Sequence, residues 1–270
     1  MQNCSDPGAR IHTEVVEGGN RRVVFLHGLM GRGKNFTTIA RGLADTTTSL
    51  LVDLPNHGVS CWTDGFDYIE MADLVADELR RDFCRDEPAV VLGHSMGGKV
   101  AMLLALRHPD LLAGLIIEDI APLDSSASEF EHLLGSLLKL DLESLTSRTD
   151  AHAKLKSDID DTRVRGFLLQ NLGRDGEGGF VWEPNVQMLY DELPTIVGFP
   201  DVEGTFDAHP VLWVKGANSD YINDEADVAM RKLFPVTQKI QVRDAGHWVH
   251  SEQPKIFTAT IDYYIDGRYD

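Results

Sequence analysis

The chain has 270 residues, of which 43% are hydrophobic, and a formal net charge of −18 at pH 7. Nucleic acids and anionic membrane surfaces are bound through basic patches, so this acidic balance argues against both as partners. No stretch reaches the roughly 20 apolar residues of a membrane span, and residues 1–8 lack the apolar core of a signal peptide. Cys4, Cys61 and Cys84 are too scattered for a disulfide framework or a metal site, which predicts inert thiols and a cytoplasmic location.

Apolar runs alternate with amphipathic helical patterns up to about residue 120, which is typical of a mostly parallel sheet with helices on both faces. Four continuous apolar runs are predicted to be buried strands, namely Val23–Leu26, Ser49–Val52, Ala89–Leu92 and Leu115–Ile117. Each run ends in a polar or glycine-rich loop. The carboxyl ends of parallel strands share one edge of a sheet, so these loops should form a ligand crevice.

The pattern changes between residues 124 and 207, where apolar residues recur at helical spacing. The predicted helices there are 129–140, 150–159 and 162–172, and residues 173–179 should form a loop or a hairpin turn. After this insertion we expect strands at 210–214 and 239–242 and helices at 225–233 and 253–264. The chain is therefore divided into a core of residues 1–123 and 208–270 and a helical cap, or lid, of residues 124–207.

The most informative motif is Gly93-His94-Ser95-Met96-Gly97, which follows the strand at 89–92 directly. In this Gly-x-Ser-x-Gly pattern the serine lies on a sharp strand-to-helix turn, and its hydroxyl is exposed at the end of the sheet. Ser95 is therefore the predicted nucleophile. Acyl transfer also needs two N–H donors for the developing oxyanion, and we expect them from Met96 and Leu29, the latter after the glycine of an early strand loop.

A serine hydroxyl needs a base that takes its proton, and the base needs an acid that orients it. In hydrolases with this motif the chain order is serine, acid, histidine. His247 follows the last predicted strand and is the candidate base, with His250 as its local rival; His94 is expected to pack away from the nucleophile.

The sequence pattern alone does not identify which residue is the acid. The loop after residue 214 carries Ser219 at the position where an aspartate is usual, with Asp220 one residue further. Asp119, which follows the strand at 115–117, is the other candidate. Both loops lie at the expected edge of the sheet, so spacing alone does not choose between them.

These residues resemble the α/β-hydrolase family, and within it the YbfF-like and abhydrolase-domain-11-like esterases. The segments that carry the resemblance are Phe25–Gly31, Asp53–Ser60, Gly93–Lys99, Asp119–Pro122, Gly216–Ser219 and Ala245–His250. The resemblance implies that Asp119 is the acid and that Ser219 is an accessory hydrogen-bonding residue. Pro55 departs from the family, which often has arginine before Asn-His-Gly, and this departure concerns the rim of the pocket.

The leading hypothesis is a serine hydrolase that cleaves carboxylic esters with short to medium acyl groups, with no cofactor or metal. The expected partner is a small-molecule ester or thioester, and the sequence favours no particular oligomeric state. An acyl-CoA thioesterase or an alcohol acyltransferase would use the same acyl-enzyme, and a non-catalytic ligand-binding scaffold is the third alternative. Six apolar side chains of the insertion are candidates for lining the pocket, namely Phe130, Leu133, Leu137, Phe167, Trp182 and Leu189.

Overall fold

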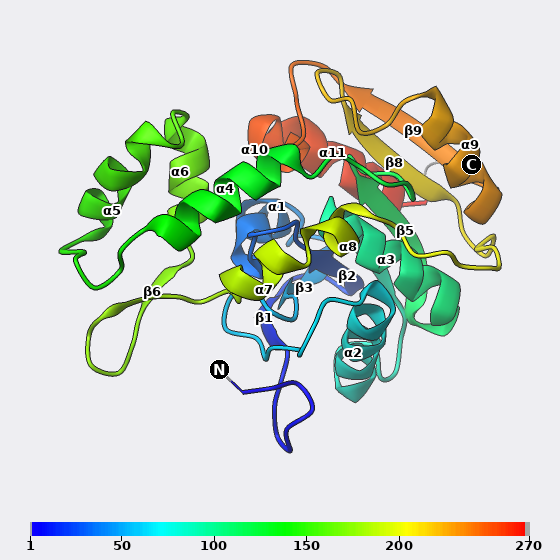
Figure 1. Cartoon of the computed structure of the whole chain (residues 1–270). Helices are drawn as coiled ribbons and strands as arrows, with labels where there is room; N and C mark the ends of the chain where they lie inside the picture. Colours follow the sequence, from blue (N-terminus) through cyan, green and yellow to red (C-terminus); the bar gives the residue numbers. More distant parts are fainter. Residues whose placement is uncertain (1, 268–270) are drawn as a thin grey trace.

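The computed structural model describes residues 2–267 and arranges them around a seven-stranded sheet (Figure 1). The strand order is β1-β3-β2-β4-β5-β8-β9, and only the β1–β3 pair is antiparallel. The strands are β1 (His12–Val16), β2 (Arg21–Leu26), β3 (Thr47–Asp53), β4 (Ala89–His94), β5 (Leu112–Glu118), β8 (Val211–Gly216) and β9 (Thr237–Val242). The predicted mostly parallel sheet is confirmed. The sequence pattern missed the edge strand β1, because no side chain of that strand is buried and its sequence has no apolar run.

Helices cover both faces of the sheet because alternate side chains of a strand point to opposite sides. Val24 and Leu26 share a core with α2 and α3, whereas Val23 and Phe25 share the other core with α1 and α11. The helices outside the insertion are α1 (Thr37–Gly42), α2 (Tyr68–Arg81), α3 (Met96–Arg107), α9 (Asp224–Leu233), α10 (Val249–Glu252) and α11 (Pro254–Ile265), with short 3-10 turns η1 (Gly33–Phe36) and η2 (Pro109–Leu111).

Between β5 and β8 the chain forms mostly helices, of which α4, α5 and α6 extend to one side of the sheet (Figure 1). The elements are α4 (Ser128–Lys139), α5 (Arg148–Lys154), η3 (Leu155–Ser157), α6 (Thr162–Leu169), β6 (Leu172–Arg174), β7 (Phe180–Trp182), α7 (Val186–Asp191) and α8 (Leu193–Val197). The glycine-rich stretch after β6 is the turn of the β6–β7 hairpin. None of the helices within residues 2–267 has the length and apolar character that crossing a membrane requires.

The end of this helical segment is tied to the helix that follows Ser95. Lys99 of α3 is 1% exposed, and its ammonium group donates hydrogen bonds to the carbonyl oxygens of Val197 and Gly198, both at 2.7 Å. Burial lowers the pKa of Lys99 to about 8. The Tyr68 hydroxyl donates to the carbonyl oxygen of Ile196 at 2.6 Å. These hydrogen bonds from α2 and α3 therefore fasten the end of the segment to the core.

Cys4 and Cys61 form a disulfide, so the prediction of inert thiols is wrong for these two residues. The N-terminal segment lies against the residues that follow β3, where the Cys4 N–H donates to the carbonyl oxygen of Trp62 at 2.6 Å. This pairing brings the two Cα atoms to 4.9 Å despite a sequence separation of 57 residues. Cys84 is a buried free thiol. Cysteine usage therefore gives no support for the expected reducing compartment.

Candidate active site

Ser95 occupies the sharp turn between β4 and α3, with φ of 52° and ψ of −121°. This region is strained for a residue with a side chain. The flanking glycines allow it, because a Cβ on Gly93 would lie 2.2 Å from the carbonyl oxygen of Gly97, and one on Gly97 would lie 2.4 Å from that of Leu26. The Ser95 N–H donates to the carbonyl oxygen of Glu118 at 3.1 Å. The turn thus holds Ser95 at the carboxyl end of the central strands.

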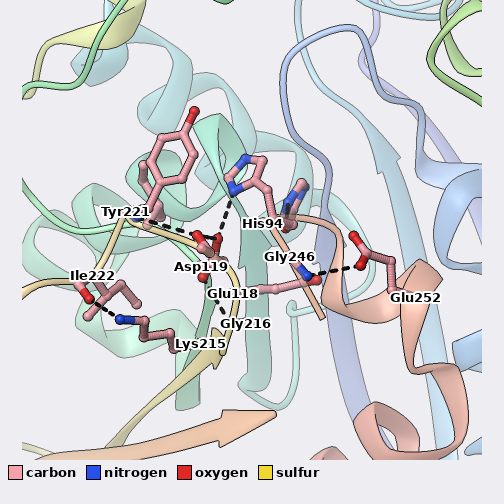
Figure 2. Close-up of polar contacts among 12 residues, drawn as sticks. His94, Glu118, Asp119, Lys215, Gly216, Tyr221, Ile222, Gly246 and Glu252 are labelled. Atoms are coloured by element: carbon pink, nitrogen blue, oxygen red, sulfur yellow. Dashed lines mark hydrogen bonds and ion pairs between the residues drawn. The ribbon is translucent and has the colours of Figure 1, made fainter. Parts of the chain in front are cut away.

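Asp119 follows β5 directly, also at a positive φ of 50°, and is fully buried. Its Oδ1 accepts the Gly216 N–H at 3.0 Å (Figure 2). Its Oδ2 accepts the Ser219 hydroxyl and lies 2.9 Å from His247 Nδ1. Gly216 and Ser219 reach Asp119 because β8 is the parallel neighbour of β5. A buried carboxylate is costly without such partners, and here three groups compensate the burial.

His247 lies on the loop after β9, stacked on the ring of Tyr221 with centroids 4.2 Å apart. An ionised carboxylate only accepts hydrogen bonds, so the bond from His247 Nδ1 to Asp119 requires the proton on Nδ1. Nε2 then carries the lone pair, and it has no hydrogen-bond partner among residues 2–267. Burial raises the pKa of Tyr221 to about 12, so its phenol stays neutral. Sequence reasoning missed Tyr221, because only the folded loops bring the two rings together.

The alternative candidates for the acid and the base, Asp220 and His250, make different contacts. Asp220 is exposed, and within the described part of the chain it makes no hydrogen bond to His247. His250 Nδ1 lies 2.8 Å from a carboxylate oxygen of Glu118. His94 is buried, and its Nε2 lies 2.9 Å from the carbonyl oxygen of His247. The geometry therefore joins Asp119, Ser219 and His247 and leaves Asp220 and His250 outside that group.

Leu29 lies on the loop after β2, and this loop runs against the turn that ends at Met96. A Cβ on Gly28 would lie 2.8 Å from His94 Nδ1 and 3.2 Å from Ser95 Cβ, so the loop before Leu29 runs directly against the turn. Met96 is the first residue of α3. The first N–H groups of a helix lack partners within it and attract negative charge. The backbone N–H groups of Leu29 and Met96 therefore belong to segments that lie against the turn of Ser95.

A cavity of about 350 Å³ is lined by Ser95, Leu29 and His247 on the core side. Phe130, Val164, Phe167 and Trp248 line this cavity and also a small apolar pocket of about 70 Å³. That pocket is also lined by Met30, Leu133, Leu134 and Leu168, and by the polar residues Glu129 and Tyr221. A larger cavity of about 930 Å³ has Ser219, Tyr221 and His247 in its lining. Of the six apolar candidates of the insertion, Phe130, Leu133 and Phe167 line these cavities, while Leu137, Trp182 and Leu189 do not.

Comparison with known proteins gives a consistent result. The model of the alpha/beta hydrolase family matches residues 23–260. The sn-1-specific diacylglycerol lipase ABHD11 of Danio rerio is 34% identical over 259 residues, covering 92% of this chain and 80% of the relative. Esterase YbfF of Escherichia coli is 31% identical, with 95% and 98% covered. The solved structure of a marine microorganism esterase is 30% identical, with a TM-score of 0.89, and the match covers 94% of this chain and 98% of that one.

Proposed function

Because this chain belongs to the alpha/beta hydrolase family, we propose that it is a serine hydrolase that cleaves carboxylic esters through an acyl-serine intermediate. The observation that carries the proposal is the pairing of Asp119 with His247 Nδ1, which leaves Nε2 free beside the cavity that Ser95 lines. The esterases and the lipase among its relatives support the same class of reaction. The residues that act are Ser95, His247 and Asp119.

The reaction begins when the Ser95 oxygen attacks the ester carbonyl and His247 Nε2 accepts the serine proton. The carbonyl oxygen becomes negative and is stabilised by the N–H groups of Leu29 and Met96, each worth about 3 kcal/mol of barrier. His247 then passes its proton to the leaving alcohol as the bond between the carbonyl carbon and the alcohol oxygen breaks. A water molecule activated by His247 attacks the acyl-serine, which releases the acid and returns the proton to Ser95.

Asp119 orients His247 and stabilises the imidazolium that forms during both steps. Ser219 supports Asp119 through the hydrogen bond from its hydroxyl to the same oxygen that faces His247. Ser219 occupies the position where an aspartate is usual, and it supports the acid through this hydrogen bond instead of acting as the acid. The acid is supplied by the neighbouring strand β5.

The substrates are esters with short to medium acyl groups. The apolar pocket of about 70 Å³ shares walls with the cavity at Ser95, and Phe130 and Phe167 narrow both spaces. We assign the acyl chain to this pocket because most of the side chains that line it are apolar. Residues 124–207 would then act as the cap that sets acyl length, over a core of residues 1–123 and 208–270.

The decisive experiment is the Ser95→Ala variant, measured with short-chain aryl esters and with a fluorophosphonate probe. Turnover should fall by at least about 1,000-fold, labelling should disappear, and the thermal unfolding transition should be preserved. Undiminished turnover or labelling would reject Ser95 as the nucleophile. A wild-type protein that never reacts with the probe would favour a non-catalytic scaffold.

A thioesterase or an alcohol acyltransferase would share the acyl-enzyme and differ in what it does with the acyl group. Purified protein is therefore incubated with an ester, with an acyl-CoA in water, and with the same acyl-CoA plus an alcohol. Ester cleavage at the highest kcat/KM is the expected result, since the net charge of −18 disfavours a polyanionic CoA substrate. Preferential release of free CoA, or formation of a new ester, would replace the proposal by the corresponding alternative.

A further inference from the structure

Glu118 is a fully buried carboxylate that the proposed chemistry does not use. It ends β5, immediately before Asp119, and lines none of the cavities described above. Its Oε1 accepts the backbone N–H of His250 at 2.8 Å, and the His250 Nδ1 lies 2.8 and 3.0 Å from the two carboxylate oxygens. Glu118 and His250 therefore form a second carboxylate–imidazole pair beside that of Asp119 and His247.

This second pair connects the segments that carry the nucleophile, the acid and the base. The carbonyl oxygen of Glu118 accepts the Ser95 N–H at 3.1 Å, and Asp119 is its chain neighbour. His250 is three residues after His247 in the same loop and first helical turn. One residue thus holds the main chain of the nucleophile with its carbonyl group and the loop of the base with its carboxylate.

His94 adds a further contact to the main chain of His247. A carbonyl oxygen only accepts, so the contact of 2.9 Å between His94 Nε2 and the carbonyl of His247 places a proton on Nε2. The His94 ring also packs on those of His247 and His250, with centroids 4.7 and 5.0 Å away. Burial lowers the pKa of His94 well below its usual value, so the ring is neutral. Its donated hydrogen bond therefore ties the main chain of His247 to the end of β4.

The geometry points to Glu118, His250 and His94 as positioning residues that hold the main chain of the loop of His247, so that its imidazole reaches Ser95. The inference rests on the proposed function. Asp119 fixes the rotation of the His247 ring through Nδ1, but the position of its main chain depends on these other contacts. A misplacement of about 1 Å in an active site can cost on the order of 100-fold in rate.

The same three side chains have ligand atoms within 4.8 Å of one another and could by composition hold a metal ion. Both carboxylate oxygens of Glu118 and one ring nitrogen of each histidine already bond to protein groups, Glu118 to the main chain and Nδ1 of His250, and His94 Nε2 to the main chain of His247. These bonds favour the positioning role. Activity should accordingly be insensitive to EDTA, and loss with EDTA that zinc restores would overturn the assignment.

The direct test is Glu118→Gln, which keeps the shape and removes the charge that faces the His250 ring. Active sites are counted by the end point of fluorophosphonate labelling, and kcat is expressed per labelled site. We expect kcat to fall by about 10- to 100-fold with KM within about twofold, because Glu118 does not touch the cavity. The labelling end point should stay complete. A lower end point with unchanged kcat per labelled site would show a merely structural role and overturn the inference.

The matched control is Asp73→Asn, which neutralises another carboxylate paired with an imidazole, that of His108 at 2.7 Å on the outer helices. It should leave kcat within about twofold of the wild type, since that pair lies outside the cavity at Ser95. A fall in kcat equal to that of Glu118→Gln would overturn the inference, because the effect would then be general to such pairs.

Two variants of His94 keep the inference testable if Glu118→Gln does not fold. His94→Phe keeps a ring in the stack but removes the donor to His247, whereas His94→Gln offers an amide N–H in its place. His94→Gln should therefore retain a higher kcat than His94→Phe, and equal losses would overturn the inference. Failure of Ser95→Ala to abolish labelling would instead reject the proposed function, so the two failures are distinguishable.

Discussion

The loops at the carboxyl ends of the strands and the helical segment 124–207 meet at the same cavity but are built differently. The loops bury polar side chains and pair them. Asp53, for example, accepts the Gly33 N–H at 2.8 Å and the Val59 N–H at 3.2 Å. The helical segment instead presents apolar side chains such as Leu134, which is 0% exposed.

Under the proposed function, this difference assigns turnover to the strand-end loops and acyl-chain selectivity to the helical segment. Hydrogen bonds have fixed directions, so a changed polar residue in the loops displaces the reacting groups. Apolar contacts have no direction, and apolar cores accept changed side chains if volume is roughly kept. Substitutions in the strand-end loops should therefore reduce turnover or stability, while those in the helical segment should alter which acyl chain is preferred.

The largest effect is expected at Asp119. Asp119→Asn replaces the acceptor that faces His247 Nδ1 with an amide and favours the wrong tautomer, so kcat should fall by about 1,000- to 10,000-fold. Asp220→Asn is the matched control and should retain kcat within about twofold, because Asp220 is exposed. Steady-state kinetics on an aryl ester measures both, and a loss confined to the Asp220 variant would reverse the assignment.

The next prediction also concerns the strand-end loops, because Cys61 of the disulfide lies in the loop after β3. Cys4→Ser opens a cross-link of 57-residue separation, which lowers the free energy of unfolding by up to about 4 kcal/mol on chain-entropy grounds. Urea denaturation with and without a reducing agent measures the change. The reductant should still destabilise a Cys84→Ala variant, whose thiol is free. No difference between oxidised and reduced protein would contradict the expectation.

His57, in the same loops, makes stability depend on pH. Burial lowers its pKa to about 3, whereas the unfolded imidazole titrates near 6.5. Below pH 6.5 the unfolded state binds a proton that the folded state does not, so stability falls as pH falls from 6.5 toward 3, by about 1.4 kcal/mol per unit. Between pH 6.5 and 5 the cost is about 2 kcal/mol. Denaturation of His57→Gln should show a shallower pH slope than wild type, and identical slopes would contradict this.

The smallest effect is expected in the helical segment. Leu134→Ala enlarges the pocket of about 70 Å³ without touching the strand-end loops. The kcat/KM for an octanoyl ester relative to an acetyl ester should rise by about tenfold, as expected for added room in an apolar pocket. Leu137→Ala is the control, because Leu137 is equally buried on the same helix and lines neither the cavity at Ser95 nor the apolar pocket. An equal shift in both variants would contradict the role of the pocket.

Much of the architecture could be predicted because its signals are local. The apolar runs of β2 to β5 and β8 mark parallel strands, and the glycines around Ser95 mark a turn that only small neighbours permit. Helical spacing likewise predicted α4 and α6 to within a few residues. The edge strand β1 was missed since its exposed side chains carry no such pattern.

The sequence by itself determined the parallel sheet, the serine turn and the chain order in which a histidine follows Ser95, because these depend on local backbone conformation and on the periodicity of apolar residues. Only the tertiary structure decided that His247 bonds to Asp119 and leaves Asp220 exposed, that Cys4 meets Cys61, and that Glu118 pairs with His250. These contacts join segments distant in the sequence, whose distances are set by strand order and loop packing, and residue spacing along the chain does not encode them.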